Sequence, residues 1–368
     1  MFSYWEKSFF EESDFVVIGA GIVGLSTALH LKRDHPKRKV LVLESGSRPS
    51  GASTKNAGFA CFGSAGEILD DLNYLSDREV FDLVAKRLAG LKVLRAELGD
   101  KNIGFNPCGG YELLRANSIE SQNILNNLDS LNHLLNPLLG EEVFRKLRKP
   151  EEFGFKNFKE VIYNPFEGGL NPVKLMETLA SKVQSLGVAI RYGVKVEKID
   201  LTENRVDCEN GIVLKPRKTF ITTNGFAKQL IQDIDLKPAR AQVLITKPIK
   251  GLNLSGTFHF DRGYYYFRNV GNRILFGGGR NLDLESEFTY SQETTDKIQN
   301  HLEDILRRDI LPGKDVEIDH RWAGTMGVGS SKTYLTERVG KRVFLGVRLG
   351  GMGVALGILV GKELSILE

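Results

Sequence analysis

Residues 14–24 read Asp-Phe-Val-Val-Ile-Gly-Ala-Gly-Ile-Val-Gly, an apolar run that leads directly into a glycine-rich turn. A run of this length and composition is typical of a strand buried on both faces of a parallel sheet. A helical pattern follows to about Lys32, and a second apolar run, Val40 to Leu43, ends at Glu44. The stretch therefore predicts a strand–helix–strand unit of an α/β protein, with a dinucleotide site at its first turn.

The glycines of this turn have separate physical tasks in such a site. Gly19 lets the chain turn sharply, Gly21 lets the backbone approach a pyrophosphate, and Gly24 lets the helix sit close to the strand. The N-terminus of the helix, at Ile22, offers free N–H groups and the favourable end of the helix dipole to phosphates. Glu44 can accept hydrogen bonds from ribose hydroxyls and would repel a 2′-phosphate, so NADP is disfavoured.

A second loop of small residues, Gly51 to Gly58, follows the acidic residue. Such a loop can approach a long cofactor closely and offer it hydroxyl and amide groups, which favours FAD over NAD. On the residues alone, an ordinary polar loop explains the same pattern equally well. The predicted cofactor contacts around this loop are Ser45, Ser53, Thr54, Lys55, Asn56, Ala57 and Gly58.

The bulk properties of the chain disfavour several other classes of protein. Its 368 residues suffice for two packed units, and its net charge of +4 comes with lysines and arginines dispersed along the sequence. A nucleic-acid-binding surface is therefore not expected. Cys61, Cys108 and Cys208 are too far apart for a ligand motif, and no metal site is expected. So sparse a set of thiols is typical of a reduced, cytoplasmic protein.

No membrane or export segment is expected. The first seven residues lack a basic region followed by an apolar run, so they do not resemble a signal peptide. The most apolar tract, Val343 to Val360, contains Arg348 and several glycines, and it is too interrupted to span a bilayer.

Alternating strands between Gln242 and Phe276 predict an antiparallel sheet separate from the parallel one. We also expect a strand pair over residues 103–114, a helical segment over 118–149 and a helix beginning at Asn171-Pro172. Parallel-sheet segments recur at the start, middle and end of the chain. The expected division is a discontinuous FAD-binding domain of residues 1–98, 166–232 and 319–368, and a substrate domain of residues 99–165 and 233–318.

Taken together, these motifs resemble the D-amino-acid oxidase superfamily, specifically its glycine oxidase and sarcosine oxidase-like branch. The likeness covers most of the chain and rests on residues 14–24, Glu44, 51–58, 171–172, 194–199, 222–225 and 322–353. It implies an α/β fold in which a glutathione-reductase-type, Rossmann-like FAD-binding domain carries an inserted antiparallel-sheet (α+β) substrate domain. It also implies oxidation of a small amine or amino acid by hydride transfer from a C–H next to nitrogen to flavin N5. Imine hydrolysis and reoxidation by oxygen or another acceptor would follow.

The resemblance assigns further cofactor contacts. Val196 would bind adenine through its backbone, and Asn224 and Gly225 belong to another matching segment. The glycine turn and helix start formed by Gly350, Gly351, Met352, Gly353 and Val354 would place N–H groups beside the flavin pyrimidine oxygen. Reduction builds negative charge at that edge of a flavin, and a helix N-terminus stabilises such charge.

The chain also departs from the family pattern. Amino-acid-oxidising members hold the substrate carboxylate with two arginines, whose positions match Met326 and Gly351 here. Sarcosine oxidases carry an oxygen-activating lysine in the strand matching Ile274 to Gly277, which has none. No cysteine follows Cys208, so we expect non-covalent FAD. The pattern Trp-x-Gly-x-Met-Gly at 322–327 is closer to amine-oxidising relatives such as γ-glutamylputrescine oxidase.

Four residues are candidates for the substrate side of the site. Tyr264 and Tyr266 alternate in an expected strand and would share one face toward the flavin, although aromatic packing explains them as well. Arg280 could replace the missing carboxylate clamp, because a guanidinium pairs bidentately with carboxylates, or form a surface ion pair instead. Arg348 lies in a glycine turn where small residues are expected. The six histidines show no ligand spacing and are expected to be structural or exposed.

The sequence therefore predicts a non-covalent FAD oxidase or dehydrogenase acting on a small amine or amino acid. Its alternatives are an FAD-dependent 2-hydroxy-acid dehydrogenase and a non-catalytic FAD-binding scaffold. A flavin-dependent RNA-modification module is less well supported, because the dispersed charge gives no basic face. The substrate and the oligomeric state are left open.

Overall fold

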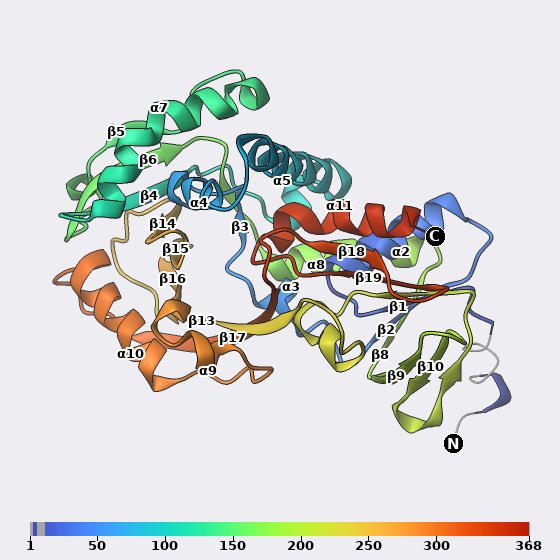
Figure 1. The fold of residues 1–368 in the computed structure, drawn as a ribbon. Helices are drawn as coiled ribbons and strands as arrows, with labels where there is room; N and C mark the ends of the chain where they lie inside the picture. Colours follow the sequence, from blue (N-terminus) through green and yellow to red (C-terminus); the bar gives the residue numbers. More distant parts are fainter. Residues whose placement is uncertain (1–2, 6–11, 368) are drawn as a thin grey trace.

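The computed structural model describes residues 3–5 and 12–367, and Figure 1 shows one large sheet in each half of the molecule. The prediction about the first seven residues falls partly outside this range. The first sheet has six strands in the order β18–β19–β12–β1–β2–β8. β18 pairs antiparallel with β19, and the other neighbours pair parallel. Its strands are β1 (Phe15–Ile18), β2 (Val40–Glu44), β8 (Ala189–Tyr192), β12 (Lys218–Ile221), β18 (Leu335–Arg338) and β19 (Val343–Val347).

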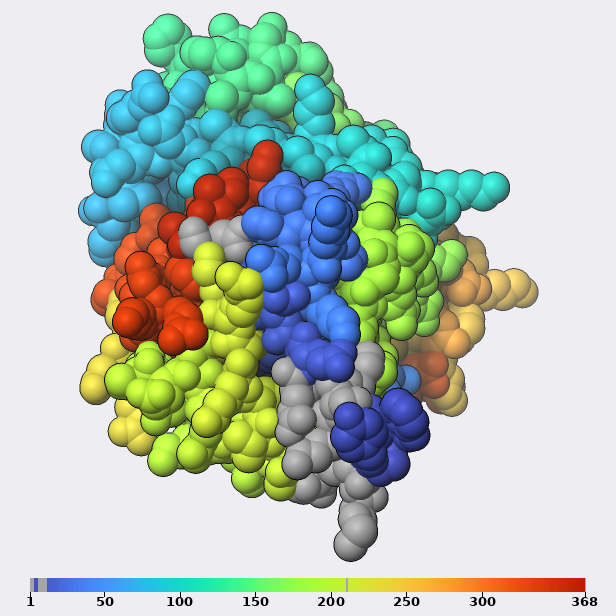
Figure 2. Space-filling view, turned by 90° about the vertical axis from the view of Figure 1, so that its right-hand side faces the viewer, coloured from blue at the N-terminus to red at the C-terminus, as the bar shows by residue number. Residues whose placement is uncertain are grey.

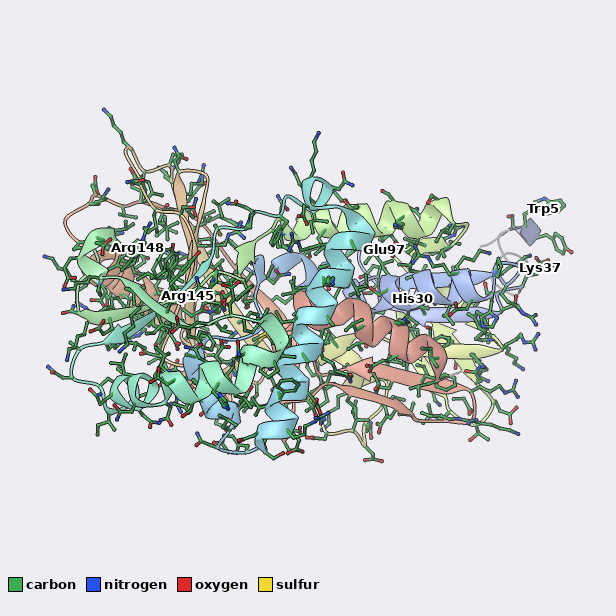
Figure 3. All side chains as sticks on the ribbon, turned by 90° about the horizontal axis from the view of Figure 1, so that it is seen from above. Trp5, His30, Lys37, Glu97, Arg145 and Arg148 are labelled. Atoms are coloured by element: carbon green, nitrogen blue, oxygen red, sulfur yellow. The ribbon has the colours of Figure 1, made fainter. Side chains whose placement is uncertain are left out.

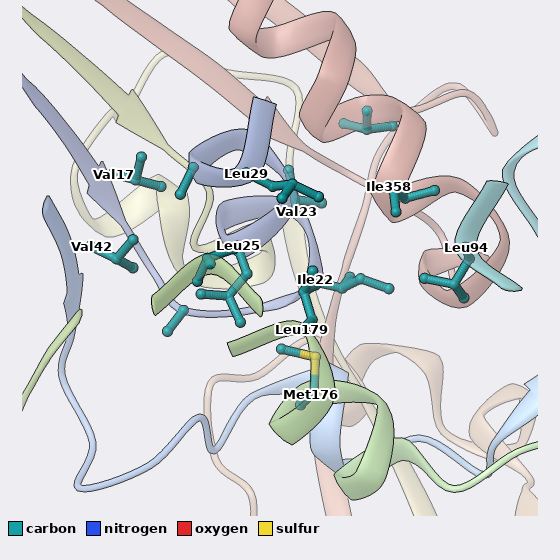
Figure 4. Close-up of a cluster of buried hydrophobic side chains, with 14 of the residues drawn as sticks. Val17, Ile22, Val23, Leu25, Leu29, Val42, Leu94, Met176, Leu179 and Ile358 are labelled. Carbon is teal, nitrogen blue, oxygen red and sulfur yellow. The ribbon is translucent and has the colours of Figure 1, made fainter. Parts of the chain in front are cut away.

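Helix α2 (Ile22–Asp34) connects β1 to β2, which confirms the predicted strand–helix–strand unit. It lies in a buried cluster with side chains from the sheet and from the helices α5 (Asp77–Leu98), α8 (Pro172–Ser185) and α11 (Gly353–Ile366). Figure 4 shows part of this cluster, with labelled side chains that include Val17, Val23, Leu29, Val42, Leu179 and Ile358. On one face of the molecule, blue residues of α2 lie between green residues of α8 and red residues of α11 (Figure 2).

The second sheet has eight strands in the order β17–β13–β16–β15–β14–β4–β6–β5. Its strands are β4 (Gly110–Arg115), β5 (Arg145–Arg148), β6 (Phe158–Asn164), β13 (Lys237–Thr246), β14 (Thr257–Phe260), β15 (Tyr265–Val270), β16 (Arg273–Gly278) and β17 (Ile318–Val328). Neighbours pair antiparallel except β14 and β4, which are parallel. The fold class predicted from the sequence is confirmed: a mixed α/β fold with a parallel nucleotide-type sheet and a largely antiparallel second sheet.

Shorter elements complete the chain. They are α3 (Ala52–Lys55), β3 (Phe59–Ala60), α4 (Ala65–Asp71), α6 (Asp100–Ile103), α7 (Ile119–Leu139), β7 (Gly168–Gly169), β9 (Val196–Asp200), β10 (Arg205–Cys208), β11 (Val213–Leu214), α9 (Leu284–Glu287) and α10 (Asp296–Ile305), with single turns of 3-10 or π helix between them. No helix within residues 3–5 and 12–367 is long and apolar enough to cross a membrane.

Two predicted elements were wrong, in both cases because glycines end a helix. The segment 103–114 is not a strand pair: α6 ends at Ile103 and is capped by the left-handed Gly104 (φ +62°), Asn106 forms only an isolated bridge with Gly169, and a single strand, β4, follows. The helical segment expected over 118–149 ends at Leu139 because Gly140 adopts φ +72°. Arg145–Arg148 then forms β5, which pairs with β6.

The division into two domains stays a prediction, but one boundary needs adjustment. β17 is paired along its length with β13 in the eight-stranded sheet. Residues 318–328 therefore belong with that sheet, and the last FAD-domain segment would begin after Val328 rather than at residue 319.

An ion-pair network ties α5 to the helices of the first sheet. Glu97, labelled in Figure 3, lies in the last turn of α5 and accepts hydrogen bonds from the two terminal nitrogens of the Arg33 guanidinium at 2.6 and 2.9 Å. Lys182 of α8 contacts the same carboxylate and donates to the Glu97 carbonyl oxygen at 2.7 Å. The hydrogen bonds from Arg33, followed by those from Lys182, lower the pKa of Glu97 to about 2.

Helix α11 approaches its neighbours through glycines. A Cβ atom built at Gly361 would lie 2.4 Å from Ser26 Cβ and 2.7 Å from Thr27 N, both in α2. A Cβ atom at Gly90 of α5 would lie 1.9 Å from the carbonyl oxygen of Ala355. The backbones of α2, α5 and α11 are therefore in contact where no side chain fits.

We predict that Gly361→Val lowers the free energy of unfolding by about 3 kcal/mol, because the added side chain forces α11 away from α2. Chemical denaturation of the variant and of Lys362→Val, at the exposed neighbouring position, measures the effect. Equal losses in the two variants would show that the close helix contact is not the cause.

Candidate functional site

The glycine turn after β1 has the geometry of a dinucleotide site. Gly19 adopts φ +100°, and its N–H donates to the carbonyl oxygen of Leu43 at 2.7 Å. A Cβ atom at Gly24 would lie 1.9 Å from the Gly19 carbonyl oxygen and 2.6 Å from Thr222 Oγ1. Glycine at position 24 thus brings the start of α2 against the turn, as the sequence pattern requires.

Glu44 closes this turn from the end of β2. Its Oε2 accepts the Ala20 N–H at 3.0 Å, and its Oε1 accepts the Gly46 N–H at 3.0 Å. The carboxylate is 9% exposed and lines a large cavity. Each oxygen can accept a further hydrogen bond, so the carboxylate can hold ribose hydroxyls while it fixes the two strand ends.

The second small-residue loop lies against the N-terminus of α2. Ser53 Oγ accepts the Ile22 N–H at 3.0 Å. Asn56 folds back onto the loop, since its Oδ1 accepts the Gly58 N–H at 2.9 Å. Thr54 Oγ1 donates to Pro49 and Gly51 carbonyl oxygens, so its hydroxyl serves the loop itself.

One cavity of about 1250 Å³ extends from the glycine turn to the face of the eight-stranded sheet. Most predicted cofactor residues line it: Gly19, Gly21, Ile22, Glu44, Ser45, Ser53, Lys55, Asn56, Ala57, Val196, Asn224, Gly350, Gly351, Met352, Gly353 and Val354. Gly24, Thr54, Gly58 and Gly225 are not part of its lining. Gly24, Gly58 and Gly225 instead allow close backbone approaches, with built Cβ atoms 1.9, 2.3 and 2.4 Å from carbonyl oxygens.

The C-terminal glycine turn also lines the cavity, and its predicted contact with the flavin stays a prediction. Gly350 and Gly351 adopt φ +55° and +90°, and α11 begins at Gly353 directly after them. Its first N–H groups thus begin at the cavity wall. Asn224, with φ +46°, fixes this turn through its Oδ1, which accepts the Arg348 N–H at 3.1 Å.

The residues present fit an FAD molecule. The cavity is lined by the N-terminus of α2, by Glu44 and by the start of α11, and a helix N-terminus suits phosphate groups. Thr223 and Thr325 line this cavity, and among residues 3–5 and 12–367 their buried hydroxyls have no hydrogen-bond partner. Unpartnered buried hydroxyls beside a cavity indicate a polar ligand.

The substrate-side candidates lie on the same cavity. Tyr264 is not in the strand: it ends the turn before β15, which starts at Tyr265, so strand alternation does not position it. Tyr264 and Tyr266 nevertheless both line the cavity, whereas Tyr265 is buried on the other side against Phe260. Arg280 also lines it, and its guanidinium forms no hydrogen bond or ion pair with the described residues. Burial raises the pKa of Tyr266 to about 12, and the charge of Arg280 opposes this rise.

Two other cations are held by the protein itself. Arg348 lines the cavity, but its guanidinium forms an ion pair with Asp235 and donates from Nε to the Thr333 carbonyl oxygen at 3.0 Å. Lys55 donates to Gln292 Oε1, and burial, aided by the charge of Arg48, lowers its pKa. Arg280 is therefore the better placed of the two arginines to meet a ligand.

The two positions without the family arginines are close together. A Cβ atom at Gly351 would lie 3.7 Å from Met326 Sδ, and both residues line the cavity. Neither residue carries a charge, so this part of the wall has no carboxylate clamp where the family pattern has one, as the sequence indicates. An anionic ligand group would have to bind elsewhere.

The sequence analysis missed a buried ion pair that reaches the cavity wall through His259. His259 Nε2 lies 3.0 Å from Glu167 Oε2, and the two side chains are 6% and 1% exposed. Strand pairing places His259 opposite Tyr266 on one side and Glu112 on the other. One signal was available: in Thr257-Phe258-His259-Phe260, alternation puts His259 on the face opposite the two phenylalanines. Glu167 gave no sequence signal.

Charge on neighbouring residues keeps this imidazole protonated. Burial disfavours its charged form, but the charge of Glu167 and its hydrogen bond, together with the charges of Glu67 and Glu112, outweigh that effect, and the pKa of His259 rises to about 9. Burial raises the pKa of Glu112 itself to about 7, against hydrogen bonds from Gly66 and Ser64.

Cys61 lies beside this pair, and the possible ligand atoms of Cys61, Glu167 and His259 are all within 4.8 Å of one another. No metal site was expected, and sequence spacing did not indicate this group. Burial raises the pKa of the Cys61 thiol well above its usual value. Because metals bind the thiolate and the neutral imidazole, a protonated thiol and a protonated ring do not favour a metal.

A nucleotide-type sheet, a glycine turn at a helix start and a cavity shared with a second sheet are typical of a dinucleotide-binding protein. The comparisons with known proteins agree. A family model described as FAD-dependent oxidoreductase matches residues 14–366. The chain belongs to this family and is an FAD-dependent oxidoreductase.

Individual relatives are distant. The chain is 24% identical to the probable oxidoreductase OrdL of Haemophilus influenzae over 96% of this chain and 82% of the relative. It is 25% identical to L-2-hydroxyglutarate dehydrogenase of Escherichia coli over 61% of this chain and 50% of that protein. The crystal structure of glycine oxidase from Geobacillus kaustophilus superposes with a TM-score of 0.76 at 18% identity, covering 96% of this chain and 95% of that one.

The His259–Glu167 pair makes stability fall as the pH rises. Below about pH 6.5 the ring is protonated in both the folded and unfolded states, and the pair contributes fully. Between about 6.5 and 9 only the folded state holds the proton, so the contribution is lost progressively. We predict that the wild type loses up to about 3 kcal/mol more unfolding free energy across this range than His259→Gln does.

Chemical denaturation at both ends of this pH range measures the difference. The variant His133→Gln, at an exposed position on α7, should follow the wild type. Parallel profiles for the wild type and His259→Gln would contradict the assignment.

Proposed function

We propose that the protein oxidises a small amine or amino acid at the carbon next to nitrogen, using non-covalently bound FAD. The observation that carries the proposal is the single cavity that joins the glycine turn to a wall with Tyr264, Tyr266 and an unpaired Arg280. Bound FAD would accept the hydride, and imine hydrolysis would complete the reaction. Oxygen or another acceptor would then restore the oxidised cofactor.

The chain's own residues would bind and orient both molecules. Gly21 and the N-terminus of α2 would face the pyrophosphate, and Glu44 would hold the ribose. The backbone of Val196 would meet adenine, and the start of α11 would stabilise charge at the flavin pyrimidine edge. These assignments are supported by the positions of all four elements along one cavity.

Arg280 would bind a substrate carboxylate. Its guanidinium is unpaired, and the apolar Met326–Gly351 region leaves no other arginine free at this wall among the described residues. A guanidinium offers two parallel N–H donors to a carboxylate. Arg348 would instead hold the C-terminal glycine turn in place through Asp235.

A second candidate is the oxidation of a 2-hydroxy acid. It is supported by the similarity to L-2-hydroxyglutarate dehydrogenase, although the chain spans only half the length of that relative. A hydroxy acid would use the same carboxylate partner and the same cofactor. The two candidates differ in the heteroatom bonded to the oxidised carbon, which is nitrogen in one and oxygen in the other.

Anaerobic mixing of the FAD-loaded protein with amines, amino acids and 2-hydroxy acids tests the proposal. We expect nitrogen compounds to bleach the flavin absorbance band and hydroxy acids to leave it unchanged. Arg280→Met should raise the KM for an amino acid by about tenfold to a hundredfold, with little effect on the matching amine that lacks the carboxylate. Bleaching by hydroxy acids alone would overturn the amine assignment. An unchanged KM would remove Arg280 from the site.

A further inference from the structure

At one corner of the cavity the wall residues Glu67, His259 and Cys61 are backed by two buried carboxyl groups, Glu112 and Glu167, which do not line the cavity themselves. We call this region the acid corner and define it by Glu67, Glu112, Glu167, His259 and Cys61. The neighbouring Asp70 and Asp71 are balanced by ion pairs with Lys332, Arg262 and Arg87. Glu67 is different: it lines the cavity and pairs with no cation in the described part of the chain.

Glu67 is held in a defined position. Its Oε2 accepts the Ser64 N–H at 2.9 Å as part of a capping box. A Cβ atom built at Gly263 would lie 2.6 Å from its Oε1, so this oxygen contacts the β14–β15 turn. The carboxylate therefore stays in the cavity wall, where it forms no ion pair with a described residue and acts on the protonated His259 through its charge alone.

The acid corner favours protons on every group that titrates there. Burial raises the pKa of Cys61 and of Glu112, and the charge of Glu67 adds to the rise in both. For His259, burial acts in the opposite direction, but Glu167, Glu67 and Glu112 together raise the pKa. Tyr266 on β15 is neutral. A region that stabilises added protons also stabilises an ammonium group.

His259 is fixed so that one ring nitrogen is available. Nε2 is bound to Glu167, whose oxygens also accept hydrogen bonds from Thr257 at 3.1 Å and Asn164 at 3.2 Å. Phe59 packs edge-on against the ring at 5.0 Å. Nδ1 has no hydrogen-bond partner among residues 3–5 and 12–367, and the residue lines the cavity. The arrangement resembles that of a general base whose ring is oriented by a carboxylate.

We propose that the acid corner binds the amine of the substrate and that His259 Nδ1 takes the proton from its ammonium form. Glu167 acts as the positioning residue for the ring. This rests on the proposed function, and it adds the step that prepares the amine for oxidation. An ammonium nitrogen has no lone pair, so the carbon beside it cannot release a hydride to form an imine.

The proton balance is simple. When the amine binds, the ring first releases its own Nδ1 proton to solvent. The ammonium N–H bond then breaks and a new Nδ1–H bond forms, which frees the nitrogen lone pair. The C–H hydrogen then leaves with its electron pair to FAD, and the lone pair completes the C=N bond. Water hydrolyses the imine, and the ring proton returns to solvent.

The transfer to His259 determines how many protons the substrate amine and the ring share in the enzyme–substrate complex. Near neutral pH the free ring and a free alkylamine are both protonated, because their pKa values lie near 9 and near 10.4. The productive complex keeps one proton between them. Binding therefore releases a proton, and kcat/KM should rise with pH toward about 9.

Calorimetry of the FAD-loaded protein with tert-butylamine measures this release without turnover, since that amine has no C–H next to nitrogen. Titration at about pH 8 in buffers of different ionisation enthalpy should show nearly one proton released by the wild type and none by His259→Gln. Equal release by the two proteins, or none by the wild type, would overturn the proposal.

Rapid anaerobic mixing with an oxidisable amine gives a second readout. His259→Gln should reduce the flavin about a hundredfold more slowly near neutral pH and regain speed as the amine deprotonates in solution. Glu167→Gln should shift the kcat/KM midpoint from about 9 toward 6.5. His133→Gln should match the wild type in both experiments.

A variant that removes only the charge separates the electrostatic role of Glu67 from its structural role in the capping box. Glu67→Gln keeps the capping box, because glutamine serves at that position too. It should weaken tert-butylamine binding about tenfold, and Glu67→Asp should restore part of the loss. If amines reduce the flavin but none of these variants alters the pH profile, proton release or affinity, this inference fails and the proposed function stands. If no amine reduces the flavin, the proposed function fails first.

Discussion

The contact between Gly24 and the carbonyl oxygen of Gly19 is the constraint on which the rest of the site depends. With 1.9 Å between that oxygen and any Cβ atom, only glycine lets α2 begin directly above the end of β1. Glu44 fixes the same turn by accepting the Ala20 N–H. Ser53 then reaches the first N–H of α2 and brings the second loop onto the cavity. A bulkier residue at position 24 would displace all three.

The wall of the cavity formed by the eight-stranded sheet is distinguished by charged side chains rather than by close backbone contacts. Arg280 is an unpaired cation on one side of Tyr266, and the acid corner with His259 lies on the other side through strand pairing. An amino acid has the complementary charges, a carboxylate and an amine. The same wall lacks the two arginines of the family pattern, and Met326 and Gly351 leave that region apolar. The chain therefore departs from that pattern in the placement of charge, while it keeps the fold.

Features encoded locally were predictable from the sequence. The turn from Gly19 to Gly24, the acid at Glu44 and the helix start at Asn171-Pro172 each rest on neighbours a few residues apart, and the structure has the elements where expected. Features made by the fold were not predictable. Glu167 and His259 are 92 residues apart in the chain and meet only because the second sheet brings them together. The partner of Arg348, Asp235, is equally remote in sequence. The roles of individual residues toward FAD and substrate stay predictions.

The central claim is that the β1–α2 turn holds the pyrophosphate of FAD. Titration of the apoprotein with FAD, followed by flavin fluorescence, tests it most directly through Gly21→Val. A Cβ atom at Gly21 meets only Ser53 Oγ, at 3.1 Å, so the fold tolerates it while the side chain enters the cavity. FAD affinity should fall about a hundredfold with an unchanged melting temperature. Wild-type affinity in this variant would contradict the assignment.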